Sequence, residues 1–131
     1  MNGAQRAYQT ALTLNPFNND AQARYLKFLA RTGQGEVAGN ELRTLVQRVP
    51  SCDAGWLRLG EVQLMRSEFS DAVVSFQNAV SEKPYLVSAY LGLVEAYSRM
   101  GNNRLAEVAF LRASTLSPRH PRITGIRKQA S

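Results

Sequence analysis

Cys52 and His120 are the side chains best suited to catalysis at neutral pH, and the 131-residue chain has one residue of each type. A nucleophile needs a general base beside it, and a metal site needs several ligands at matched spacing. Cys52 has no neighbouring catalytic motif, and no carboxylates are paired as acid and base. Glycine-rich phosphate loops are absent as well. The sequence therefore predicts no catalytic residue, no metal and no cofactor, and we expect the chain not to be an enzyme.

Basic side chains are the next candidates, because 16 Lys and Arg outnumber 10 Asp and Glu and give a net charge of +6. Four of them, Arg119, Arg122, Arg127 and Lys128, lie in a C-terminal stretch that contains no acid. A nucleic-acid-binding domain usually clusters its Arg and Lys along the folded surface. We therefore expect a solvated basic end, and binding to nucleic acid or an anionic membrane is disfavoured.

The framework that must position these residues repeats every 34 positions. Four prolines mark the period, at Pro16, Pro50, Pro84 and Pro118. Between them, bulky and small side chains alternate at fixed offsets, which indicates paired helices in close contact rather than one amphipathic helix. The matched sets are Trp56, Leu59, Gly60, Ala72, Phe76 and Ala79 in one unit, and Tyr90, Leu93, Ala106, Phe110 and Ala113 in the next.

This pattern resembles the tetratricopeptide repeat, a helix–turn–helix unit with the form W-x2-L-G-x2-Y, then A-x3-F, then A, then P. Residues 53–84 depart from it at Gln63, where tyrosine is usual, and residues 87–118 have Tyr97 there but Val94 at the glycine site. The resemblance implies an all-α fold, with antiparallel helix pairs stacked in a right-handed superhelix (an α-solenoid) of about three and a half repeats.

The repeat register also predicts the domain organisation. Complete units are expected at 19–50, 53–84 and 87–118, after the second helix of a truncated repeat at 1–16 and before a basic tail or partial capping helix at 119–131. The expected helices are 3–14, 19–32, 36–48, 53–66, 70–82, 87–100 and 103–116. Because a lone second helix exposes a face that a partner should cover, we expect a fragment of a larger protein. No apolar run approaches the roughly 18 residues of a membrane span, no signal peptide is visible, and the compartment stays open.

In the family, the first helix of each pair lines a concave groove, so the resemblance also implies a binding surface. Its lining positions carry over to Asp20, Ala23, Lys27, Ala30 and Arg31; to Ala54, Leu57, Glu61, Leu64 and Met65; and to Ser88, Leu91, Glu95, Ser98 and Arg99. The residues expected to contact a partner are Lys27, Arg31, Leu57, Glu61, Leu64, Met65, Leu91, Glu95 and Arg99. The leucines would supply an apolar centre, unless neighbouring helices cover them, and the glutamates would favour a basic, apolar segment.

The family also includes members that bind the C-terminal carboxylate of chaperones, and the residues of that mode are not present. The matching positions are Ala23, Lys27, Arg58, Ser88 and Gly92, of which two carry charge. The leading hypothesis is therefore a non-enzymatic scaffold that binds a peptide or helix of another protein in the groove. The alternative is an architectural segment that self-associates, or assembles a complex, through exposed repeat ends.

Overall fold

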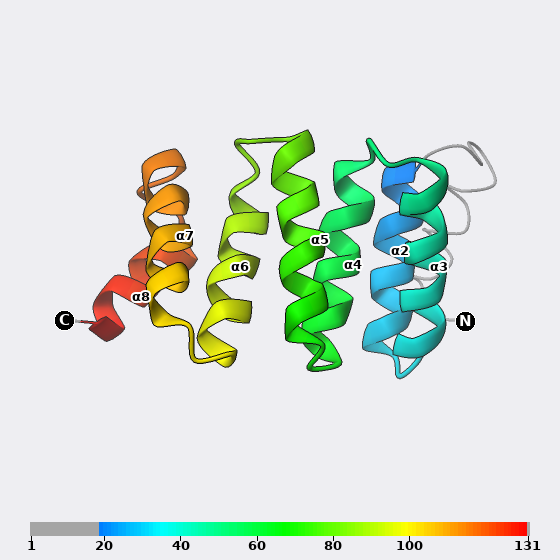
Figure 1. Ribbon diagram of the computed structural model, residues 1–131, viewed down its shortest axis with the longest axis horizontal. Helices are drawn as coiled ribbons and strands as arrows, with labels where there is room; N and C mark the ends of the chain where they lie inside the picture. Colours follow the sequence, from blue (N-terminus) through cyan, green and yellow to red (C-terminus); the bar gives the residue numbers. More distant parts are fainter. Residues whose placement is uncertain (1–18, 131) are drawn as a thin grey trace.

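The computed structural model describes residues 19–130, with side chains over 22–125, and this part of the chain contains seven helices and no strand (Figure 1). The predicted helices agree with the observed ones to within one residue at each end. The predicted helix at 3–14 lies outside the described residues. The helices are α2 (Asn19–Arg31), α3 (Gly35–Arg48), α4 (Asp53–Met65), α5 (Phe69–Glu82), α6 (Val87–Arg99), α7 (Asn103–Leu116) and α8 (Pro121–Ala130).

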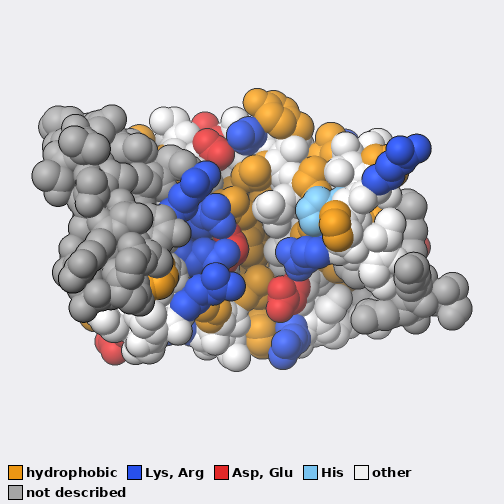
Figure 2. All heavy atoms as spheres, turned by 180° about the vertical axis from the view of Figure 1, so that it is seen from behind, with side chains coloured by type: hydrophobic (Ala, Val, Ile, Leu, Met, Phe, Trp, Pro, Cys, Tyr) orange, Lys and Arg blue, Asp and Glu red, His pale blue; other side chains and the backbone are white. Residues whose placement is uncertain are grey.

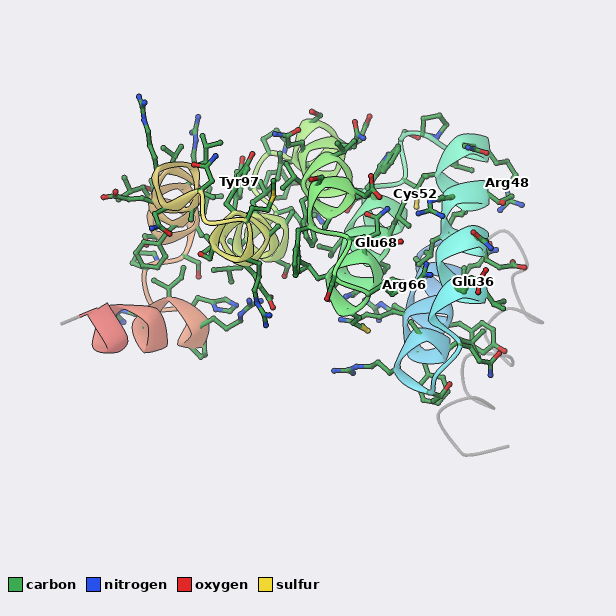
Figure 3. All side chains as sticks on the ribbon, turned by 60° about the horizontal axis from the view of Figure 1, so that its bottom comes forward. Glu36, Arg48, Cys52, Arg66, Glu68 and Tyr97 are labelled. Atoms are coloured by element: carbon green, nitrogen blue, oxygen red, sulfur yellow. The ribbon has the colours of Figure 1, made fainter. Side chains whose placement is uncertain are left out.

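Consecutive helices form antiparallel pairs, α2 with α3, α4 with α5 and α6 with α7, and the pairs stack side by side. The first helices contact one another across the pairs, α2 with α4 and α4 with α6. Seen along the helices, α2, α4 and α6 form one layer and α3, α5 and α7 form the other (Figure 3). The array therefore gives all first helices a common face, which is where a binding groove was predicted.

The turns within each pair use the same backbone conformation. Gly33 and Gly101 have φ angles of +92° and +78°, in the left-handed region that glycine adopts without steric cost, as the sequence predicts. Ser67 occupies the same place in the middle pair with a φ of +60°. The repeat geometry thus overrides the preference of serine for negative φ. The side chain of Asn102 accepts a hydrogen bond from the backbone N–H of Leu105 and so caps α7.

The aromatic residue near the start of the first helix joins successive units. The indole Nε1 of Trp56 donates a hydrogen bond to the carbonyl of Pro50 at 2.8 Å, and the hydroxyl of Tyr90 donates one to the carbonyl of Pro84 at 2.9 Å. Both acceptors belong to the prolines that close the preceding units. An aromatic side chain with a polar tip can bury its ring and still satisfy a backbone carbonyl, so Trp and Tyr interchange here.

The departure at Gln63 is compensated within its own unit. Gln63 is buried, and its Oε1 accepts a hydrogen bond from the hydroxyl of buried Ser75 at 2.6 Å. In the next unit Tyr97 takes the Gln63 position and Ala109 takes the Ser75 position. A buried amide needs a partner, so the serine makes the glutamine tolerable in the core.

Helix α8 packs on the end of the array. Ile123 is fully buried and forms a small core cluster with Leu91 of α6 and Ala113 of α7. The sequence suggests a closing helix held by Ile123 and Ile126; the side chain of Ile126 lies outside the described residues. None of the helices of the described part of the chain is long and apolar enough to cross a membrane.

Candidate functional site

The first helices line a hollow face of the molecule. Figure 2 shows hydrophobic side chains running down the middle of this face and Lys and Arg side chains gathered along one wall. A groove of about 560 Å³ lies there. Its lining comprises Lys27 and Arg31 of α2; Arg58, Glu61, Leu64 and Met65 of α4; Ser67; Phe76 of α5; Ser88, Gly92, Glu95 and Arg99 of α6; and Arg122 of α8.

Seven of the nine predicted contact residues line this groove: Lys27, Arg31, Glu61, Leu64, Met65, Glu95 and Arg99. Met65 is the most open of the apolar ones, with 45% of its surface exposed, and Leu64 is half-buried. The family register thus brings residues from three helices, far apart in the sequence, onto one surface.

Leu57 and Leu91 are the two exceptions, and their placement corrects the expected apolar centre. Leu57 is 6% exposed and lies in the core with Ala72 and Phe76, whereas Leu91 is 1% exposed and lies against Ile123. The next elements along the array cover each leucine, as the sequence analysis allowed. Both leucines therefore support the groove from beneath and do not face it.

Phe76 lies fully buried beneath the groove, between its first helices, and the repeat pattern does not assign it this place. Although it belongs to a second helix, its ring lies against two glycines of neighbouring first helices, Gly60 and Gly92. A Cβ at Gly60 would come within 2.7 Å of the ring, and a Cβ at Gly92 within 2.4 Å. Gly92 takes the register position of Arg24 and Arg58, so the loss of a side chain there was a signal that something bulky approaches.

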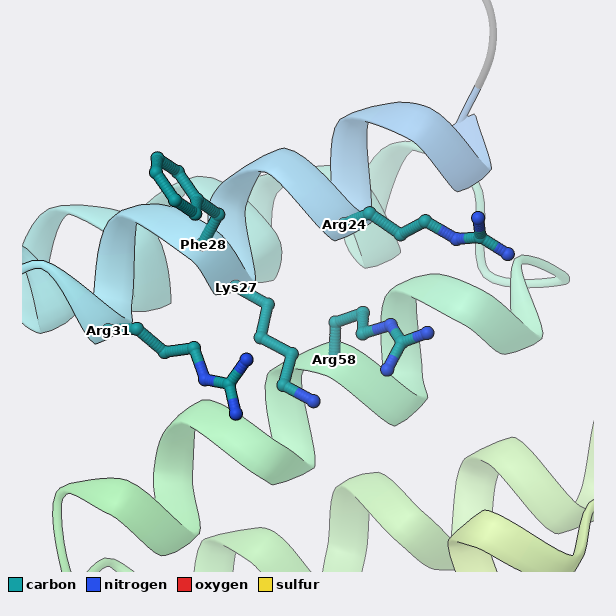
Figure 4. Close-up of a pocket in the computed structure, with 5 residues that line it drawn as sticks. All are labelled: Arg24, Lys27, Phe28, Arg31 and Arg58. Atoms are coloured by element: carbon teal, nitrogen blue, oxygen red, sulfur yellow. The ribbon is translucent and has the colours of Figure 1, made fainter. Parts of the chain in front are cut away.

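A second, smaller pocket of about 280 Å³ lies at the α2 end of the groove (Figure 4). Its lining consists of Arg24, Lys27, Phe28 and Arg31 of α2 and Arg58 of α4. Arg24 lies outside the site residues expected from the sequence, and Arg58 was expected there only as a position of the chaperone-binding mode. The two arginines are 34 residues apart, so the repeat register could have predicted that they share a face.

The two acidic residues of the groove are both paired with basic ones. One carboxylate oxygen of Glu61 forms an ion pair with the ammonium of Lys27. The other accepts a hydrogen bond from the Nη1 of Arg58 at 2.7 Å. Glu95 lies 3.9 Å from the Nη2 of Arg122. Together, the two pockets are lined by six basic side chains and two acidic ones. This charge balance goes against the expectation that the glutamates favour a basic segment.

The two residues with catalytic potential both serve as helix caps. The sulfur of Cys52 accepts the backbone N–H of Gly55 at 3.3 Å at the start of α4. The Nδ1 of His120 accepts the backbone N–H of Arg122 at 3.2 Å, just before Pro121 begins α8. Within residues 22–125, no group of three or more His, Cys, Asp or Glu side chains is placed to hold a metal ion.

Comparisons with known sequences give two curated relatives, while no protein-family model matches the chain. The chain is similar to the general transcriptional corepressor ssn6 of Schizosaccharomyces pombe, with 26% identity over 125 residues, 94% of this chain and 11% of the relative. It is also similar to superkiller protein 3 of the same species, with 30% identity over 122 residues, 88% of this chain and 9% of the relative. The chain thus spans about a tenth of the length of these relatives.

Several solved structures share the helix-pair array. MamA superposes with a TM-score of 0.73 at 25% identity, over 88% of this chain and 68% of that one. YrrB, described as a TPR protein with an unusual peptide-binding site, gives a TM-score of 0.77 at 18% identity over 95% and 64%. TTC0263, a thermophilic TPR protein in Thermus thermophilus, gives 0.76 at 21% identity over 88% and 65%. These likenesses confirm the predicted all-α solenoid.

Proposed function

This chain is built of tetratricopeptide repeats, and we propose that it acts as a non-enzymatic scaffold that binds a segment of a partner protein in the groove between its first helices. The observation that carries the proposal is the groove itself, in which side chains of α2, α4 and α6 surround an apolar floor. Two further points support it. YrrB is described as a TPR protein with an unusual peptide-binding site, and concave sites that combine apolar surface with polar groups that orient the ligand are common binding sites.

The bound segment would place an apolar side chain on Leu64 and Met65, which lie above the buried ring of Phe76. Interface energies generally concentrate in a few central, well-packed side chains surrounded by polar contacts. The basic residues along the walls would orient the segment and increase its rate of association more than its affinity.

Met65 provides the test, because Met100 offers a matched control. Both are methionines near the end of a first helix, with exposures of 45% and 47%, but Met65 lines the groove and Met100 lines neither of the two pockets described above. A peptide would be selected from a displayed random library against the full chain. Met65→Asp is expected to weaken its binding at least tenfold, about 1.4 kcal/mol, measured by isothermal titration calorimetry.

Met100→Asp is expected to leave the affinity within about twofold, since it adds the same charge at similar exposure elsewhere. Circular dichroism melts of both variants check that the fold is retained. Equal losses in both variants, or a loss for Met100→Asp alone, would contradict the groove as the binding site.

A second candidate, self-association, is favoured by the outer side of α7. Leu105, Val108 and Leu111 are all exposed there at intervals of three residues. The matching positions of α5 hold Asp71, Val74 and Gln77, so the apolar stripe is particular to the last pair. Sedimentation of the peptide-free chain distinguishes the candidates: a size that rises with concentration supports self-association, and a constant monomer rules it out over that range.

A further inference from the structure

We infer that the pocket at the α2 end of the groove, defined by Arg24, Lys27, Phe28, Arg31 and Arg58, binds acidic side chains, so that the groove selects an acidic segment of its partner. The inference rests on the proposed function and specifies the chemistry of its ligand. The partner segment is then acidic, whereas Glu61 and Glu95 taken alone suggest a basic one.

The lining of this pocket is unusual in its charge. Four of its five residues are cationic, the fifth is Phe28, and no carboxylate belongs to it. Three of the cations, Arg24, Lys27 and Arg31, follow one another along one side of α2 at intervals of three and four residues. Like charges one turn apart repel each other, so this row raises the positive potential of the pocket. An anion bound between α2 and α4 would relieve the repulsion among these cations.

Glu61 of α4 pairs with two of these cations and does not neutralise them. One carboxylate holds both the ammonium of Lys27 and the guanidinium of Arg58, so a net positive charge remains even within this triad. The contacts also fix the two cations at the border between the pocket and the main groove, which both residues line. Glu61 therefore acts as a positioning residue for the cations.

Basic side chains with unused hydrogen-bonding capacity lie in the same place. The Nε of Arg58 is buried and has no hydrogen-bond partner in the described part of the chain. Arg31 is exposed and forms no ion pair with another described residue, although it lines both pockets. A guanidinium presents several N–H donors in a planar fork that matches a carboxylate, which makes Arg31 and Arg58 suited to an Asp or Glu side chain.

The continuity of the two pockets defines the order of residues in the ligand. Lys27, Arg31 and Arg58 line both, so a segment lying over Leu64, Met65 and Phe76 would continue directly into the basic pocket. The recognised sequence would therefore combine an apolar side chain with acidic side chains a few positions away. This arrangement needs no free C-terminus, which separates it from the chaperone-tail mode that the sequence lacks.

The experiment compares three labelled synthetic peptides by fluorescence anisotropy against the full chain. Each has the same central Leu and Phe residues and an amidated C-terminus, and they differ in carrying Glu, Gln or Lys on one side. We expect the Glu peptide to bind at least about tenfold more tightly than the Gln peptide and the Lys peptide to bind most weakly. The preference for Glu should shrink as salt is raised from low to high ionic strength, because screening weakens exposed charge pairs.

Arg31→Glu is expected to abolish the preference for Glu, whereas Arg112→Glu is expected to preserve it. Arg112 is an exposed arginine of α7 that lines neither pocket, so it matches the charge change without touching the site. If the Gln or Lys peptide binds as tightly as the Glu peptide, or if none of the three binds, the inference is overturned. In either case the library-selected peptide could still bind and still lose affinity on Met65→Asp. That result would support the groove as the binding site while the preference for acidic segments fails, so failure of the inference is distinguishable from failure of the proposed function. A labelled single-stranded oligonucleotide that outcompetes the Glu peptide would assign the pocket to phosphate groups and would also overturn the inference.

Discussion

Replacing Phe76 by Ala is expected to lower the free energy of unfolding by about 3–5 kcal/mol, the range observed when a buried phenylalanine is truncated. Phe76 is fully buried, and its ring fills the space between Gly60 of α4 and Gly92 of α6. Removing it would leave a cavity between two repeat units as well as within one. Urea denaturation followed by circular dichroism measures the change, and a loss below about 1 kcal/mol would contradict this role for the ring.

The same contact predicts that Phe76 and Gly92 are energetically coupled. Gly92→Ala should cost about 1–3 kcal/mol in the native chain, because a Cβ there would come within 2.4 Å of the ring. In the Phe76→Ala background that clash is absent, and the same substitution should be neutral or stabilising by up to about 1 kcal/mol, since Ala is the better helix former. Additive effects in this double-mutant cycle would show that the ring and the glycine do not meet.

Gly39→Ala is the matched control for this cycle. Gly39 also lies inside a helix, α3, but a Cβ there would meet its nearest atom, the Nη1 of Arg66, at an ordinary 3.5 Å. We expect this substitution to be neutral or stabilising in both backgrounds.

Replacing Leu57 and Leu91 together by Ser is expected to unfold the chain or bring it close to unfolding. Each leucine is buried, and each truncation should lower the free energy of unfolding by about 2–5 kcal/mol. The two losses together are comparable to the whole stability of an ordinary domain. The repeat register alone gives a different expectation, because it places both leucines in the groove. Denaturation of the double variant decides between the two expectations. Near-native stability combined with lost peptide binding would show that both leucines face the groove.

The repeat pattern was sufficient to predict where the helices and the turns lie, because the steric requirements of proline, glycine and small residues are local. At Ser67 the preference of the residue alone gives the wrong φ, whereas its register position, 34 residues from both Gly33 and Gly101, gives the right one. The pattern could not place Leu57 and Leu91, because whether a residue on a first helix is covered depends on the following pair and on α8. Burial at such positions is a property of the stack.

The charge of the groove was harder to predict than its position. Read along the sequence, Glu61 and Glu95 lie among the lining residues and suggest a basic ligand. In space, Glu61 is shared between Lys27 and Arg58, and Arg24 and Arg31 add positive charge beside them. The partners of Glu61 come from two repeat units, and one of them, Arg58, lies at a position outside the family's groove set. Pairwise contacts of this kind appear only once the helices are assembled.

The central claim, that the groove between the first helices is the partner-binding face, is tested most directly by NMR. Amide chemical shifts of the full chain would be followed while the library-selected peptide is titrated in. We expect the largest changes on groove residues of three helices, such as Arg31, Met65 and Glu95, and the smallest on Val74 and Val108 of the opposite layer. Changes concentrated on α3, α5 and α7, with the groove residues unaffected, would contradict this claim.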